Sequence, residues 1–193
     1  MAKKLIAITG GIGSGKSLAL SILKSEGYYT LSSDQITAEL YEKRKIKLLL
    51  KKMFPVAVKG FFNPKIDRSK ISEIVFNNKE KLEQLTATIT PLVVAEILKR
   101  AKKVKENLFV EVPILFERGY QNQFDKVIII TRAMEDRINS VKIRSNLSKE
   151  QVLDRIKNQF DYENADLSPY FSIQNDGSAE VLKQKLLDAI KNI

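Results

Sequence analysis

The sequence predicts an α/β fold in which a parallel, doubly wound sheet carries a helical insertion. Apolar runs typical of buried strands recur near residues 5–9, 107–112 and 126–131, with amphipathic helical patterns between them. A glycine-rich turn joins the first of these strands to the first helix. Strands that alternate with helices generally pair in parallel, because each crossover helix returns the chain to the same end of the sheet.

Composition limits the chemistry that this fold can support. The chain has 193 residues, which fits one domain, and 44% of them are hydrophobic. It contains no Cys and no His, so disulfides, thiolates and imidazole bases are excluded and a reducing cytoplasm is expected. The net charge of +10 favours polyanionic partners, although a surface of solvated lysines explains it equally well. No apolar run is long enough to predict a membrane span.

The first strand leads into a loop that matches the pattern G-x-x-x-x-G-K-[ST]. Gly10, Gly15, Lys16 and Ser17 occupy the fixed positions, and an amphipathic helix follows until Gly27. Glycines let successive N–H groups point inward and, with the helix N-terminus, cradle phosphates. Lys16 is predicted to contact the β- and γ-phosphates of ATP, and the Ser17 hydroxyl to bind Mg²⁺. The fold class is therefore P-loop NTPase-type.

A second short strand at residues 28–31 ends in a polar segment that closes on Asp34. Functional residues of open α/β sheets gather just beyond strand ends. Asp34 also precedes a predicted helix at residues 35–42, where aspartate is a common N-cap. A catalytic base and a helix cap both remain open for this residue.

Residues 43–106 are rich in lysine and helical in pattern. A basic amphipathic helix at 43–54 is ended by Pro55, a loop is predicted at 56–64, and a helix opens at Asp67-Arg68 and runs to Phe76. A further helical pattern is expected to break at Thr90-Pro91 and then resume. This helical insertion is the natural place for a second substrate to bind.

Residues 107–193 return to alternating strands and helices. Glu111 ends one strand, where it could hold a Mg²⁺-bound water or simply face solvent. After the strand at 126–131, helices are predicted at about 133–145 and 148–160, the second opened by a capping box of Ser148 and Gln151. A short strand at 171–173 and a helix capped by Ser178 complete the fold. The predicted division is a core (1–34, 107–132 and 171–193), an insertion (about 35–106) and a lid (about 133–168).

Several separated motifs, in order and at compatible spacing, resemble the dephospho-coenzyme A kinase family over nearly the whole chain. The opening T-G-G-I-G-S-G-K-[ST] is intact from Thr9 to Ser17. The family's P-L-L-F-E is close to Pro113–Glu117, and its I-x-N-x-G fits Ile173, Asn175 and Gly177. Weaker matches are Asp34 in D-A-D, Asp67-Arg68 in L-D-R, Phe124-Asp125 in F-D, Arg155 to Gln159 in R-x-x-x-Q, and Ala165-Asp166 in A-D.

The resemblance implies ATP-dependent phosphorylation of the ribose 3′-hydroxyl of dephospho-coenzyme A, the last step of coenzyme A synthesis. Asp34 would orient or deprotonate that hydroxyl, and Arg144 or Arg137 would neutralise the transferred phosphate from the lid. Arg68 and Glu117 would face the acceptor together with Asp34. ATP would be bound by Gly11, Ile12, Gly13, Ser14, Gly15, Lys16, Ser17 and Asn175, with Asn175 at the adenine edge and Ser17 on the metal.

The chain departs from the family pattern at a few positions. Ser32 replaces the first Asp of D-A-D, Thr90 replaces the His of an H-P pair, and Asn63-Pro64 stands in place of D-G. Of two lid arginines four residues apart, the first position holds Ser140 and the second holds Arg144, with Arg137 about one turn earlier.

Two alternatives remain open at this point. The chain could phosphorylate another nucleoside or nucleotide, because the phosphate loop is shared by such kinases. It could also be a P-loop ATPase that binds nucleic acid, which its positive charge permits, but the resemblance implies neither a nucleic-acid nor a membrane partner. An N-K-x-D guanine motif is absent, which argues against a GTPase switch. The sequence leaves the oligomeric state open.

Overall fold

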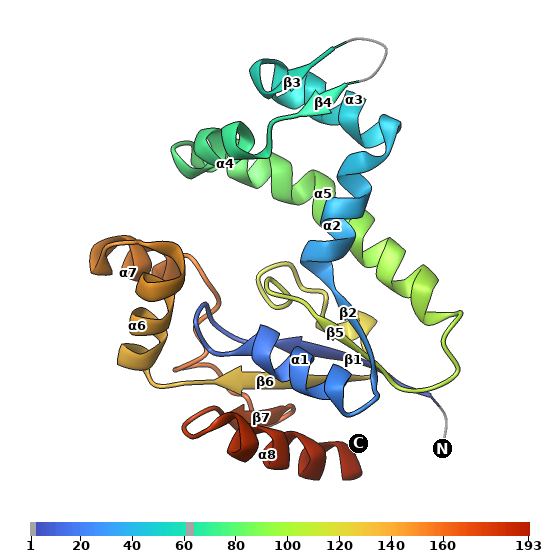
Figure 1. Cartoon of the computed structure of the whole chain (residues 1–193), viewed down its shortest axis with the longest axis vertical. Coiled ribbons are helices and arrows are strands. Elements are labelled where there is room, and N and C mark those ends of the chain that lie inside the picture. Colours follow the sequence, from blue (N-terminus) through green and yellow to red (C-terminus); the bar gives the residue numbers. More distant parts are fainter. Residues whose placement is uncertain (1–2, 61–63) are drawn as a thin grey trace. The chain divides into compact units, whose positions relative to one another are not determined.

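All strands of the main sheet pair in parallel, in the order β2-β5-β1-β6-β7 (Figure 1). The structure, a computed structural model, describes residues 3–60 and 64–193. The strands are β1 (Leu5–Thr9), β2 (Tyr29–Ser32), β5 (Leu108–Glu111), β6 (Lys126–Thr131) and β7 (Phe171–Gln174). Because β5 and β6 lie on opposite sides of β1, the chain reverses its winding there and opens a crevice at the carboxyl ends of the strands. The predicted α/β class is confirmed.

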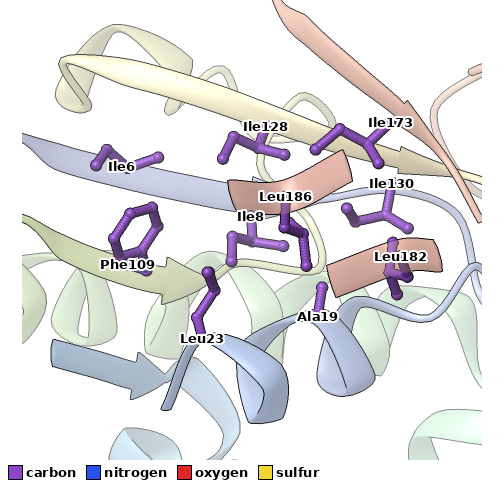
Figure 2. Packing of buried hydrophobic residues seen from close by; sticks show 10 residues of the cluster. All are labelled: Ile6, Ile8, Ala19, Leu23, Phe109, Ile128, Ile130, Ile173, Leu182 and Leu186. Carbon is purple, nitrogen blue, oxygen red and sulfur yellow. The ribbon is translucent and has the colours of Figure 1, made fainter. Parts of the chain in front are cut away.

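Two helices, α1 (Lys16–Ser25) and α8 (Ala179–Lys191), pack on one face of this sheet and form the main core (Figure 2). Ala19 and Leu23 of α1 and Leu182 and Leu186 of α8 are all buried against strand side chains. Burying one such leucine fully contributes about 1.5–3 kcal/mol, so this core fixes the helix that follows the glycine loop.

A separate small cluster joins α6 (Met134–Ser145) to α7 (Lys149–Lys157). Ile138, Val141 and Val152 are its buried members. The capping box predicted at Ser148 and Gln151 is present at the start of α7, where the Ser148 hydroxyl accepts from Gln151 N. A 3₁₀ turn, η2 (Gln121–Gln123), precedes β6.

By its internal contacts the chain forms two compact units. The first contains the residues up to Ser32 and from Lys103 onward, and the second contains Ser33–Lys102. The second unit consists of helices with a short hairpin: α2 (Ser33–Glu42), α3 (Arg44–Met53), η1 (Pro55–Ala57), β3 (Val58–Lys59), β4 (Lys65–Ile66), α4 (Arg68–Phe76) and α5 (Lys79–Ala101). The boundaries of core, insertion and lid given above stay a prediction.

Three local expectations were wrong. Helix α5 runs through Pro91 without a break, because Ile89, Val93 and Ile97 on either side of it are buried in the second unit. The segment expected to be a loop at 56–64 contains β3, which pairs with β4 directly after that segment; each strand has two residues and is too short to show an alternating pattern. Residues 61–63, including Asn63, lie outside the described residues, as do residues 1 and 2.

The third correction concerns Asp34. Helix α2 begins at Ser33, so Asp34 lies inside its first turn and is not the N-cap. An acidic side chain in the first turn still interacts favourably with the positive end of the helix dipole.

Along residues 3–60 and 64–193, no helix is both long and apolar enough to cross a bilayer.

Candidate functional site

The loop between β1 and α1 has the backbone of an anion-binding nest. Gly10, Gly13 and Gly15 have positive φ angles of 142°, 77° and 104°, which favour glycine. A Cβ atom added to Gly13 would lie 2.5 Å from the carbonyl oxygen of Arg137, so a larger residue has no room there. Gly15 caps α1 in the left-handed conformation, and this leaves the first N–H groups of α1 without a side-chain cap.

Lys16 is enclosed by the loop that it follows. Its ammonium donates to the carbonyl oxygens of Gly10 at 2.8 Å and Gly11 at 3.0 Å. Burial lowers the pKa of Lys16 from 10.5 to about 8, although the negative charge of Glu111 opposes this change. The ammonium is therefore held inside the nest by carbonyls that are weaker partners than phosphate oxygens would be.

Ser17 and Glu111 meet beside the loop. The Ser17 hydroxyl donates to Glu111 Oε1 at 2.9 Å, and Glu111 is buried, which rules out the solvent-facing alternative. Ser17 and Glu111 both offer oxygen atoms, the ligands that Mg²⁺ prefers, so they fit a Mg²⁺ site whose other ligands come from a bound nucleotide. Among residues 3–60 and 64–193, no group of three or more acidic side chains could hold a metal alone, so phosphate oxygens and water would supply most ligands.

Arg137 lies on the glycine loop and is buried. Its Nε donates to Ile12 O at 3.1 Å, and its Nη1 pairs with Glu163 Oε1 at 3.3 Å. A Cβ atom on Gly11 would lie 2.4 Å from Arg137 Nη2, so the arginine needs a glycine there. Burial lowers the pKa of Arg137 below its usual range.

Arg144 lies in the last turn of α6 and is exposed. Its positive charge contributes to lowering the pKa of Lys16, as that of Arg137 does, so both guanidinium groups act on the loop electrostatically. Ser140, which occupies the position of the missing family arginine, accepts from Arg132 Nη1 at 2.8 Å.

Asn175 and Glu117 border the same region. The Asn175 amide donates to Ser14 O at 2.8 Å and is buried, so it braces the loop; the predicted adenine contact stays a prediction. Glu117 Oε1 accepts from Phe160 N at 3.0 Å, whereas its Oε2 is buried and has no hydrogen-bond partner among the described residues. A buried carboxylate oxygen without a hydrogen-bond donor is unusual in a folded protein.

The other two acceptor-side candidates belong to the second unit. Asp34 is exposed, and its carboxylate follows Ser32, the last residue of β2, by two positions. Arg68 begins α4; its Nη2 donates to Ala38 O and to Glu42 Oε1, both at 3.1 Å. Arg68 also lines a hollow of about 550 Å³ together with Lys59 and Lys65, a surface suited to anionic groups.

One group of contacts was missed by the sequence reasoning. Gln159 Oε1 accepts from Ile12 N at 2.7 Å, and the Tyr162 hydroxyl lies 3.1 Å from Thr9 Oγ1. Burial raises the pKa of Tyr162 to about 12, so it stays neutral at physiological pH. The segment after α7 therefore holds the loop from one side, and no spacing in the sequence indicates a contact between residues 147 positions apart.

The central strand of the parallel sheet leads into a glycine nest around a buried lysine, and two arginines act electrostatically on that nest. These features define a P-loop nucleotide-binding enzyme of the kinase type. The family model described as dephospho-CoA kinase matches residues 4–180. The chain belongs to the dephospho-CoA kinase family.

Individual relatives agree with this assignment. A dephospho-CoA kinase of Thermus thermophilus is 34% identical over 183 residues, covering 94% of this chain and 88% of the relative. A crystal structure of a Thermus thermophilus protein superposes with a TM-score of 0.83 at 31% identity, covering 100% and 99% of the two chains. A dephospho-CoA kinase from Campylobacter jejuni superposes with a TM-score of 0.70 at 31% identity, covering 97% and 96%.

Proposed function

We propose that this protein transfers the γ-phosphoryl group of ATP to the ribose 3′-hydroxyl of dephospho-CoA, giving CoA and ADP, and that it works in the cytoplasm. The observation that carries the proposal is the glycine nest around Lys16 in a chain whose match to the family extends over residues 4–180. Phosphoryl transfer needs mainly positioning and charge neutralisation, which backbone N–H groups and cations supply.

In this proposal ATP binds through the N–H groups of Gly11 to Ser17. Lys16 exchanges its two carbonyl partners for oxygens of the β- and γ-phosphates. The Ser17 hydroxyl, which donates to Glu111 Oε1, would hold a Mg²⁺ ion bound with the nucleotide, and the Glu111 carboxylate would accept from a water of that site. A bound Mg²⁺ neutralises charge on the phosphate oxygens.

The acceptor is proposed to bind the helical insertion (about 35–106), with Arg68 on its anionic groups and Asp34 on its 3′-hydroxyl. Glu117, through its unpartnered oxygen, is proposed as a further acceptor contact. Asp34 orients the hydroxyl and takes its proton as the bond to phosphorus forms. Arg137 and Arg144 of the lid (about 133–168) neutralise the phosphate, and Asn175 supports the loop and the adenine edge.

A coupled assay of ADP release tests the proposed acceptor. Dephospho-CoA, adenosine, nucleoside monophosphates and shikimate are each offered with MgATP. Dephospho-CoA is expected to raise the rate at least a hundredfold above the others, with CoA confirmed as product by mass. Faster transfer to another alcohol, or ATP turnover that nucleic acid stimulates without any transfer, would overturn the proposal.

Arg137→Ala and Arg144→Ala are expected to have different effects. Each should lower kcat about a hundredfold or more, because each removes a cation near the transferred phosphate. Only Arg137→Ala should also lower the thermal midpoint, since it leaves Ile12 O and Glu163 without a partner. Lys142→Ala, exposed on the same helix, is the control. Unchanged kcat in both arginine variants would remove them from the mechanism.

Binding of ADP is expected to weaken as the pH rises above about 8. In the free protein the pKa of Lys16 is about 8, and phosphate oxygens in place of carbonyls raise it. Binding therefore takes up a proton between these two pKa values, and Kd rises by up to about tenfold per pH unit there.

Calorimetry at pH 8.5 in two buffers of different ionisation enthalpy measures this proton uptake. Lys16→Met, which cannot titrate, should abolish it. Equal heats in both buffers for the unmodified protein would contradict the assignment to Lys16.

A further inference from the structure

The peptide groups of Ile12, in the middle of the glycine nest, are held from both sides by side chains distant in sequence. Ile12 N donates to Gln159 Oε1 at 2.7 Å, and Ile12 O accepts from Arg137 Nε at 3.1 Å. The two flanking residues are glycines, Gly11 and Gly13, whose backbones have few steric barriers to rotation. Without these two bonds, the peptide before Ile12 could turn and take neighbouring N–H groups out of the nest.

Gln159 is itself held on a firm support. Its backbone N donates to Ile156 O at 3.1 Å, the C-terminal end of α7. The next residue, Phe160, stacks on Phe116 with ring centroids 4.7 Å apart, and its N donates to Glu117 Oε1. The amide oxygen is thus presented to the loop by a segment fixed to α7 and to residues 116 and 117.

The chemical nature of the side chain matters at this position. An amide oxygen accepts from Ile12 N without adding charge. A carboxylate would accept equally well but would repel the phosphates that the nest receives, and an alkyl side chain would leave Ile12 N without its partner. Glutamine is the side chain of this length that satisfies the loop while keeping the nest positive.

We propose that Gln159 is a positioning residue for the nucleotide phosphates: it fixes the Ile12 peptide and so keeps the glycine nest in its binding conformation. It acts through Ile12 and does not touch the reacting atoms. The inference rests on the proposed function only in taking a nucleotide as the ligand of the nest. It also gives a role to the contact between the loop and the segment that follows α7.

Two nearly isosteric variants, Gln159→Met and Gln159→Glu, test the proposal through direct calorimetric binding of ADP, with no acceptor present. Methionine keeps the volume but removes the acceptor, and ADP should bind about tenfold more weakly. Glutamate keeps the acceptor but adds charge, and the loss should reach about a hundredfold. Asn158→Ala is the matched control, because that side chain donates to Asp154 O of its own helix and should leave the affinity unchanged.

Steady-state kinetics separate positioning from a general loss of structure. In Gln159→Met the KM for ATP should rise while the KM for dephospho-CoA stays within about twofold. ADP affinity within twofold of the unmodified protein would overturn the proposal. A loss of ADP affinity that disappears when the variant is measured well below its unfolding temperature would also overturn it, because partial unfolding would then explain the loss. If the unmodified protein binds ADP but does not phosphorylate dephospho-CoA, the proposed function fails and the ADP comparison still decides the role of Gln159.

Discussion

Replacing Lys16 with methionine is expected to lower kcat/KM for ATP by about a thousandfold, because it removes the cation that the nest holds ready for the β- and γ-phosphates. The loss should appear in kcat as well as in KM, since charge on the phosphate oxygens is redistributed as the bond breaks. The measurement is steady-state transfer to dephospho-CoA, with ADP binding measured separately.

The same variant is expected to stay folded. The pKa of Lys16 in the folded protein, about 8, lies below its ordinary value of 10.5, so the protonated form is the one that folding disfavours. That cost to stability is fully present below pH 8 and disappears as the pH rises toward 10.5. Methionine removes the buried charge at pH 7, and this offsets the loss of the bonds to Gly10 and Gly11.

Lys24→Met, in the last turn of the same helix and exposed, is the matched control and should keep full activity. A Lys16→Met protein with kcat within tenfold of the parent would show that the nest does not hold the transferred phosphate.

The parts of the fold that sequence could predict are those specified by neighbouring residues. Strand β6 was expected at 126–131 because a continuous apolar run is typical of a buried parallel strand. The capping box at Ser148 and Gln151 is a contact within one turn. The glycine loop is predictable for the same reason, because the apolar strand before it and the amphipathic helix after it are both visible in neighbouring residues.

Elements governed by distant contacts were predicted less well. Pro91 indicates a break by local rules, yet α5 is continuous because its apolar residues pack against α2 and α4 of the second unit. The sequence predicts a helix from residue 35 with Asp34 directly before it, whereas α2 begins at Ser33. Sequence patterns place a helix start only to within a residue or two, so they do not assign the N-cap residue.

The candidate site shows the same division. Lys16 and Ser17 follow from the pattern, whereas the contacts of Gln159, Arg137 and Asn175 with the loop cross 147, 125 and 161 positions of sequence. The positive-φ glycines were expected for phosphate binding. The structure adds that Gly11, Gly13 and Gly15 also leave room for the side chain or backbone of Arg137 and for Asn175.

Asp34→Asn is expected to lower kcat by about a hundredfold to ten-thousandfold. The chain has no histidine, and in the proposed function a carboxylate orients or deprotonates the acceptor hydroxyl. Asp34 follows the carboxyl end of β2, the edge at which open α/β sheets bind ligands, and its exposed side chain is open to a substrate. Asparagine keeps the shape and one acceptor oxygen, so the KM for dephospho-CoA should change by less than about threefold.

A matched control separates catalysis from the helix dipole. Asp34 lies in the first turn of α2, and Glu80 occupies the first turn of α5 in the same unit. Both acids interact with a helix N-terminus, at typically 0.3–1 kcal/mol. Glu80→Gln should therefore reproduce any small change in thermal midpoint while keeping kcat. If Asp34→Asn also keeps kcat within about threefold, another residue accepts the proton and aligns the 3′-hydroxyl. Glu117 is then the next carboxylate to test, because its Oε2 is buried and has no hydrogen-bond partner among the described residues.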